Sequence, residues 1–162
     1  MLVSENSLKW LVRFYPPLFF QRIWVVKFDE GFRGVEVKIT KSFFNRNYND
    51  SIFGGTIFSA ADPFYPVLFY QIFTHKGYKV KGWSRSSNIH YIKPGLTDLK
   101  FKITISDEEI AEVERILNTE GKYVRSHPID IYNKAGDLVC ASVQNEVYLR
   151  NLNFTDNAVK NE

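Results

Sequence analysis

Asp62 is the residue of this sequence whose type and surroundings are best suited to chemistry. It stands in the most hydrophobic stretch of the chain, and two adjacent glycines, Gly54 and Gly55, precede it at the start of that stretch. Free backbone N–H groups at a helix N-terminus stabilise negative charge, and glycines let a ligand approach the backbone because they carry no Cβ. A carboxylate in an apolar setting is suited to act as a general base or a nucleophile. Together these residues are suited to a site in which a carboxylate and free backbone amides act on a ligand.

Each candidate also has a purely structural interpretation. Asp62 followed by Pro63 is typical of an N-cap and first helical residue, so Asp62 could serve only to begin a helix. The two glycines are as typical of a turn as of an oxyanion site. Asn47 lies in a loop rich in Asn and Asp, and Ser84 lies in a polar Ser-Arg-Ser-Ser stretch. These settings favour a turn for Asn47 and solvent exposure for Ser84.

The spacing of these residues resembles that of the acyl-CoA thioesterases of the hot-dog fold, in their phenylacetate-degradation-like branch. The pattern of that branch is Asn, five residues, His, Gly-Gly, six residues, Asp. This sequence has Asn47, Phe53, Gly54, Gly55 and Asp62 at the same spacing.

A second block supports the resemblance. In that branch a Ser or Thr begins a strand that ends about ten residues later in an Asn-Ile-x-Tyr-x-x-Pro-like sequence. Here Ser84 precedes the run Asn88-Ile89-His90-Tyr91-Ile92-Lys93-Pro94. The resemblance extends from about Phe28 to Arg150, which is most of the chain.

The resemblance implies a role for each of these positions. Asp62 would be the nucleophile or the base that activates water, and Gly54, with Gly55 beside it, would be the main oxyanion donor. Asn47 and Ser84 would orient the water or the carbonyl group. It also implies a homodimer or a tetramer with the site at a subunit interface, so that Asn47 and Asp62 come from different subunits. The substrate would be a small-molecule acyl thioester of coenzyme A or acyl carrier protein, with no metal and no separate cofactor.

Two departures from the family pattern bear on activity. Phe53 stands where the branch has His, which removes a hydrogen-bonding group beside the carbonyl. Pro63 and Pro66 lie inside the expected helix, where each costs about 3 kcal/mol unless the helix kinks or begins later. With its Asp-Pro pair the chain is similar to a hot-dog subgroup of unassigned function. The sequence therefore predicts a thioesterase, with a non-catalytic acyl- or lipid-binding protein as the alternative; a hydratase or dehydratase of this fold ranks low, because no His is suitably placed.

Basic residues are concentrated between Lys76 and Lys102, where seven cations accompany one acid. Such a strip is suited to hold the phosphates of coenzyme A. The solvent-exposed face of strands, kept from edge pairing by charge, is an equally good interpretation. Within this part of the chain, Arg85 and Lys93 are predicted to bind substrate together with Phe53.

The elements that must position these residues follow from the periodicity of the apolar residues. Pro16-Pro17 ends the first expected helix, and Ser106 with Glu109 forms a capping box that opens the last one. The last two strands form a hairpin around residues 134–137. We expect helices at Ser4–Tyr15, Thr56–Thr74 and from Ser106 to Gly121, and strands at Ile23–Asp29, Val35–Lys41, Lys79–Ile92 (one strand or two), Leu99–Ile105, Tyr123–Asn133 and Leu138–Leu149.

This order of elements indicates the α+β class with an antiparallel sheet, because the strands are grouped around a segregated helix. A sheet wrapped around the long apolar helix is the simplest way to bury that helix, and the resemblance implies that this is a hot-dog fold. We expect one domain over residues 1–150, with an N-terminal helical extension at 1–22. Residues 151–162 read as a polar, frayed C-terminal tail.

Composition excludes several classes of protein. Apolar residues make up 44% of the 162, which excludes general disorder, and the net charge of +3 is too small for an electrostatic nucleic-acid binder. The longest near-apolar run, Phe64–Phe73, is shorter than the roughly 20 residues that a membrane-spanning helix needs. The single cysteine, Cys140, excludes an internal disulfide, and the three scattered histidines leave no zinc spacing. We therefore expect a soluble cytoplasmic protein.

Overall fold

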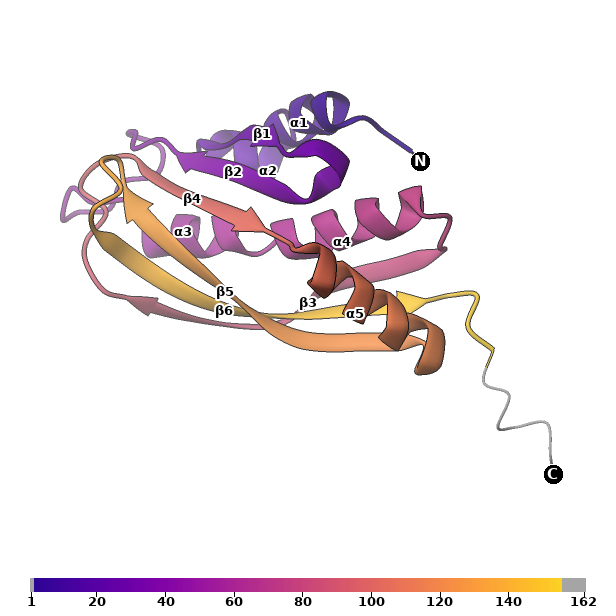
Figure 1. Ribbon diagram of the computed structural model, residues 1–162. Helices are drawn as coiled ribbons and strands as arrows, with labels where there is room; N and C mark the ends of the chain where they lie inside the picture. The colour runs from indigo at the N-terminus through magenta and orange to yellow at the C-terminus, as the bar shows by residue number, and fades with distance from the viewer. Residues whose placement is uncertain (1, 156–162) are drawn as a thin grey trace.

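A six-stranded antiparallel sheet curls around a central helical segment in the computed structural model of the protein, which describes residues 2–155 (Figure 1). The strand order is β1-β2-β4-β5-β6-β3, so β1 and β3 are the edge strands. The helices are α1 (Glu5–Arg13), α2 (Pro16–Phe20), η1 (Glu30–Phe32), α3 (Gly54–Ala61), α4 (Phe64–His75) and α5 (Asp107–Thr119). The strands are β1 (Ile23–Phe28), β2 (Gly34–Ile39), β3 (Val80–Tyr91), β4 (Leu99–Thr104), β5 (Lys122–Asn133) and β6 (Val139–Asn151).

The core lies between the sheet and the central helices α3 and α4. Figure 1 shows these helices between β1, β2 and β4 on one side and β3, β5 and β6 on the other. Leu68, Phe69 and Phe73 of α4 have no exposed surface. On β4 the buried residues alternate with exposed lysines, as the sequence predicts, because successive strand residues point to opposite faces. The predicted α+β class with an antiparallel sheet around an apolar helix is confirmed.

The central helix differs from the prediction of one continuous helix. It begins at Gly54 and is broken between Ala61 and Phe64, where Asp62 and Pro63 lie between α3 and α4. Pro66 then falls in the first turn of α4. N–H groups in a first turn have no intrahelical partner, so a proline costs little there. The break thus removes the penalty that both prolines would impose inside one helix.

The N-terminal extension forms two short helices instead of one. Ser4 caps α1, since its side chain accepts a hydrogen bond from the N–H of Ser7. This helix ends at Arg13, before the predicted end at Tyr15. Pro16 begins α2, where proline is favoured at the first position. α1 lies along the edge strand β1, and Arg13 donates from Nε to the carbonyl of Val25 at 2.8 Å.

The capping box of α5 is only half formed. Ser106 accepts a hydrogen bond from the N–H of Glu109 at 3.1 Å, as predicted. The Glu109 carboxylate does not accept a hydrogen bond from the backbone N–H of Ser106. Its Oε1 lies 3.0 Å from Nδ1 of His127 instead. A buried partner on another element has therefore replaced the local one.

The second half of the chain follows the predicted strands closely. The segment 80–91 is one strand, and β5 and β6 form the expected hairpin. β6 extends to Asn151, one residue into the predicted tail; residues 156–162 of that tail lie outside the described residues. None of the helices in residues 2–155 is long and apolar enough to cross a membrane.

Candidate active site

Asp62 lies at the break in the central helix, at the wall of a pocket of about 440 Å³, and the residue is exposed to solvent rather than buried. The pocket is formed by α1 and α2 on one side and by both central helices on the other. Its lining is mostly apolar, with Leu11 and Tyr15 from the N-terminal segment and Phe58 and Val67 from the central helices. Asp62 forms no capping hydrogen bond to α4, so the interpretation of this residue as a simple N-cap is not what the structure shows.

The backbone carbonyl of Asp62 is held by two side chains from the sheet. Pro66 has no N–H, so the usual bond from residue 66 to the carbonyl of residue 62 cannot form. Instead Ser84 donates from Oγ to this carbonyl at 2.7 Å, and Asn145 donates from Nδ2 at 3.1 Å. The structure therefore brings Ser84 next to Asp62, but the contact is to the backbone and not to the carboxylate.

Asn145 is a functional candidate that the sequence analysis missed. It has no exposed surface, and its Oδ1 accepts a hydrogen bond from Oγ of Ser87 at 3.0 Å. The sequence pattern of β6 could have identified Asn145. Asn145 shares the inward face of β6 with Val143 and Val147, and a buried polar side chain among apolar ones needs partners.

Gly54 and Gly55 are the first two residues of α3. No hydrogen bond to either N–H is formed within residues 2–155, because first-turn amides have no intrahelical partner. The carbonyl of Gly54 accepts from the hydroxyl of Tyr91 at 2.9 Å. A Cβ added to Gly55 would overlap the ring of Phe53. The glycines thus leave two amides free beside two aromatic rings.

Tyr91 belongs to the second motif block, but the sequence analysis assigned it no role. Partial burial raises the pKa of Tyr91, and its hydroxyl donates to the carbonyl of Gly54. A Cβ at Gly54 would lie 3.0 Å from Cζ of the Tyr91 ring. Tyr91 and Phe53 therefore both lie close to the free amides.

The carboxylate and the free amides lie far apart within one chain. Gly54 and Asp62 are separated by eight residues of helix, which at 1.5 Å per residue is about 12 Å. A catalytic base and an oxyanion donor must both lie about 3 Å from the reacting atoms. One chain cannot bring these two groups to one carbonyl.

Asn47 is used within its own loop. Its Oδ1 accepts hydrogen bonds from the N–H of Asn49 at 3.0 Å and from the N–H and hydroxyl of Ser51 at 3.2 and 3.1 Å. This is the turn-forming role that the loop composition favours. The structure does not bring Asn47 to Asp62 of the same chain.

The basic residues predicted to bind substrate are spread over several surfaces. Arg85 lies 3.5 Å from the carboxylate of Glu146, and Lys93 is exposed near the end of β3. Lys76 pairs with Glu114 at the end of α4. The cations between residues 76 and 102 thus do not form one strip.

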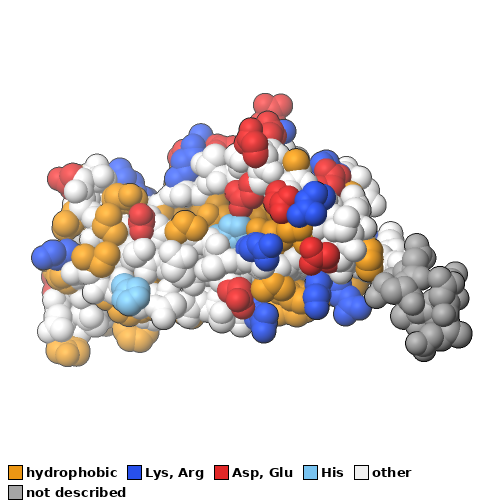
Figure 2. Space-filling model, turned by 60° about the horizontal axis from the view of Figure 1, so that its bottom comes forward, with side chains coloured by type: hydrophobic (Ala, Val, Ile, Leu, Met, Phe, Trp, Pro, Cys, Tyr) orange, Lys and Arg blue, Asp and Glu red, His pale blue; other side chains and the backbone are white. Residues whose placement is uncertain are grey.

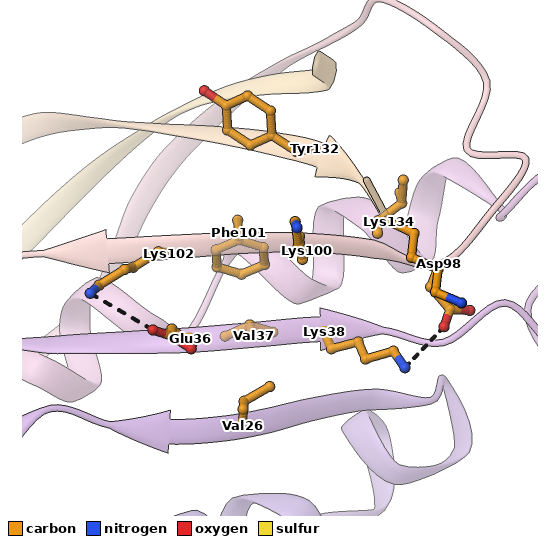
Figure 3. Close-up of a pocket in the computed structure, with 11 residues that line it drawn as sticks. Val26, Glu36, Val37, Lys38, Asp98, Lys100, Phe101, Lys102, Tyr132 and Lys134 are labelled. Carbon is orange, nitrogen blue, oxygen red and sulfur yellow. Dashed lines mark ion pairs between the residues drawn. The ribbon is translucent and has the colours of Figure 1, made fainter. Parts of the chain in front are cut away.

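Lys100 and Lys102 lie in another pocket, of about 540 Å³, on the outer face of the sheet (Figure 3). Ion pairs occupy much of its rim: Lys38 lies 3.0 Å from Asp98, and Lys102 lies 3.8 Å from Glu36. These pairs neutralise Lys38 and Lys102, so these two lysines are poorly suited to bind a phosphate.

His127 belongs to a buried cluster away from the Asp62 pocket. Its Nε2 lies 3.1 Å from the hydroxyl of Tyr123, and its ring lies 4.5 Å from that of Tyr65. Burial raises the pKa of Tyr65 to about 12, with a smaller contribution from Glu109. With Glu109 bound to its other nitrogen, His127 joins α4, α5 and β5 and is satisfied within the core.

A family model described as a domain of unknown function (DUF4442) matches residues 5–149. No curated protein matches the chain. Among solved structures, a Pseudomonas aeruginosa protein described as a probable thioesterase is 17% identical with a TM-score of 0.82, and the match covers 93% of this chain and 98% of that one. A Haemophilus influenzae thioesterase is 14% identical with a TM-score of 0.68, covering 95% and 98%.

The Escherichia coli PaaI protein of the phenylacetic acid degradation operon is 16% identical with a TM-score of 0.58, and the match covers 94% of this chain and 99% of that one. Identities this low show the fold alone. The chain therefore has the hot-dog fold, as the motif spacing implied, and is distantly similar in structure to hot-dog thioesterases.

Proposed function

The chain belongs to the DUF4442 family, and we propose that it hydrolyses an acyl thioester at a site shared by two subunits. The observation that carries this proposal is the placement of Asp62 in the wall of an apolar pocket, free of any capping role. The names of the structural neighbours support the same reaction class.

The free amides of Gly54 and Gly55 are suited to bind the oxygen of a thioester carbonyl. Negative charge develops on this oxygen during attack, and N–H groups at a helix N-terminus stabilise it. Asp62 would activate water, or attack the carbonyl carbon itself. Tyr91 and Phe53 would shield the carbonyl from bulk water, and the apolar pocket beside Asp62 would receive the acyl chain.

Two subunits are needed because Gly54 and Asp62 of one chain are about 12 Å apart. In a two-fold dimer with the central helices side by side, the N-terminus of one α3 would face the helix break of the other. β3 is an edge strand with no neighbour on one side among the described residues, and such an edge is suited to pair with a second copy. A homodimer or a tetramer, a cytoplasmic location and a coenzyme A or acyl-carrier-protein thioester complete the proposal.

The decisive experiment measures thiol release from a panel of acyl-CoAs. Asp62→Asn keeps the size of the side chain but removes the base, so we expect turnover to fall about 100-fold or more. Asp130→Asn, which removes an exposed carboxylate from β5, is the matched control and should retain activity. Equal turnover by wild type and Asp62→Asn would refute the proposal.

A non-catalytic acyl-binding protein is the second candidate. The ring of Phe53 against Gly55, where the thioesterase pattern has His, favours it because no imidazole is present to assist the reaction. This function predicts tight retention of an acyl thioester without thiol release by the wild-type protein. Rapid hydrolysis would eliminate it.

A further inference from the structure

Three cations stand side by side on the outer face of the sheet. Lys81 of β3 is directly opposite Arg150 of β6, and Arg150 is directly opposite Lys122 of β5. All three residues are exposed. Directly opposite residues share a face with their Cβ atoms about 5 Å apart, and like charges in this arrangement repel each other. The row therefore carries a concentrated positive charge at a cost to the sheet.

No carboxylate pairs with any of the three within residues 2–155. Two cations on the other half of the sheet do have carboxylate partners. Lys27 lies 3.1 Å from Asp29, and Lys38 lies 3.0 Å from Asp98. The row of Lys81, Arg150 and Lys122 thus differs from these cations in lacking a neutralising partner.

An aromatic surface adjoins the row. Trp83, Tyr148 and Val124 each lie two residues along their strand from a member of the row, so they share its face. Tyr148 of β6 is directly opposite both Trp83 of β3 and Val124 of β5. The rings of Trp83 and Tyr148 are stacked with centroids 4.4 Å apart, and Trp83 remains 51% exposed. An exposed indole offers a flat surface on which another aromatic ring can stack.

Lys81, Arg150 and the aromatic pair line one pocket of about 310 Å³, together with Leu152 and Phe154. Lys122 lies outside this lining, next to Arg150 on the neighbouring strand. A pocket of this size is at the lower end of the range for small-molecule sites. Figure 2, turned toward the underside of the molecule, shows blue Lys and Arg side chains flanking orange hydrophobic ones near the end of the described chain.

We propose that this pocket binds a nucleoside phosphate, with its phosphates on Lys81 and Arg150, its base stacked on Trp83, and Lys122 adding positive charge beside Arg150. Arginine and lysine are the usual phosphate ligands, and arginine adds a planar two-pronged contact. The row spans two strand spacings, about 10 Å, which fits one or two phosphates and not the track of a nucleic acid. Trp83 points to the outer face, whereas its neighbour Ser84 contacts Asp62 on the inner face, so the two sites are distinct.

The site is tested by calorimetric titration of the full chain with adenosine 3′,5′-bisphosphate, AMP, ADP and inorganic phosphate. We expect the nucleotides to bind more tightly than inorganic phosphate and to raise the melting temperature. A preference for adenosine 3′,5′-bisphosphate, the nucleotide end of coenzyme A, would identify a coenzyme A thioester as the source. A preference for AMP or ADP would identify a free nucleotide. Neither result depends on hydrolysis, so this test and that of Asp62 can fail separately.

Matched variants separate a built site from general surface charge. Lys81→Gln with Arg150→Gln should weaken nucleotide binding at least about tenfold. Lys100→Gln with Lys134→Gln removes the same charge from the other outer pocket and should leave binding unchanged. Trp83→Leu should weaken binding of the nucleotides but not of inorganic phosphate, because only the nucleotides carry a base to stack.

Three outcomes would overturn the proposal. One is the absence of nucleotide binding at about 1 mM ligand. Another is equal weakening by both double variants, which would show unspecific attraction to positive charge. The third is binding of oligonucleotides alone, which would point to a nucleic-acid surface.

Discussion

The hydroxyl of Ser84 lies 2.7 Å from the backbone carbonyl oxygen of Asp62, and this contact joins the break in the central helix to the edge strand β3. Asn145 reinforces it from β6. Both side chains occupy the place of the helix hydrogen bond that Pro66 cannot make. The position of the candidate catalytic carboxylate is thus set by the sheet. If β3 pairs with a second copy, the same contact places Asp62 close to the subunit interface.

The first prediction concerns the coupling between Ser84 and Pro66. Ser84→Ala should lower the free energy of unfolding by about 1 kcal/mol, because the carbonyl of Asp62 loses a donor. In a Pro66→Ala background the cost should be smaller, since the N–H added at position 66 can donate to the same carbonyl. A double-mutant cycle measured by urea unfolding gives the coupling directly. Equal costs in both backgrounds would show that the two residues do not serve the same oxygen.

The second prediction tests whether Gly54 and Asp62 of one site come from different subunits. Gly54→Pro removes the proposed oxyanion N–H at a position where proline is tolerated, since Gly54 is the first residue of α3. Phe53, with φ −59° and ψ 132°, already has the extended backbone that precedes proline. We expect Gly54→Pro and Asp62→Asn to be inactive as separate proteins. Co-expressed, they should recover about a quarter of wild-type turnover, because about half the dimers are mixed and each mixed dimer has one intact site.

The control for this experiment is Gly54→Ala. It brings the same Cβ toward the ring of Tyr91 but keeps the N–H, so it should retain more activity than Gly54→Pro. If the co-expressed variants stay inactive although mixed dimers form, Gly54 and Asp62 do not act across the interface.

The third prediction concerns acid stability. Burial acts to raise the pKa of Asp98, but hydrogen bonds from the side chain of Lys38 and the N–H of Lys41 outweigh it, and the pKa lies below its ordinary value of 3.8. A lowered folded-state pKa contributes stability above the unfolded pKa, and this contribution is lost as the pH falls through the folded value. Asp98→Asn should therefore cost about 0.5–1 kcal/mol at pH 7 and at pH 5.

Below the ordinary pKa of Asp98 the cost of Asp98→Asn should shrink progressively, because the wild-type carboxyl also becomes neutral. Urea unfolding of both proteins at pH 7, 5 and 3 measures the difference. A cost that does not change between pH 7 and pH 3 would show that the charge of Asp98 contributes nothing.

The sequence alone determined most of the elements, because their signals are local. The alternation of β4 and the hairpin of β5 and β6 appear as patterns of period two within a few residues. The start of α5 at Ser106 depends on a residue three positions further along, Glu109. The family spacing around Gly54 and Asp62 likewise required no contacts between distant segments.

Only the tertiary structure decided how these local pieces meet. Two prolines in an apolar segment do not reveal whether the helix kinks or begins later, because the answer depends on whether the sheet supplies donors such as Ser84 and Asn145. Glu109 fits the sequence pattern of a capping box. Its carboxylate instead contacts the buried side chain of His127, 18 residues further along the chain. Strand register depends on pairing between segments far apart in the chain, so the alignment of Lys81 with Arg150 is visible only once β3 lies beside β6.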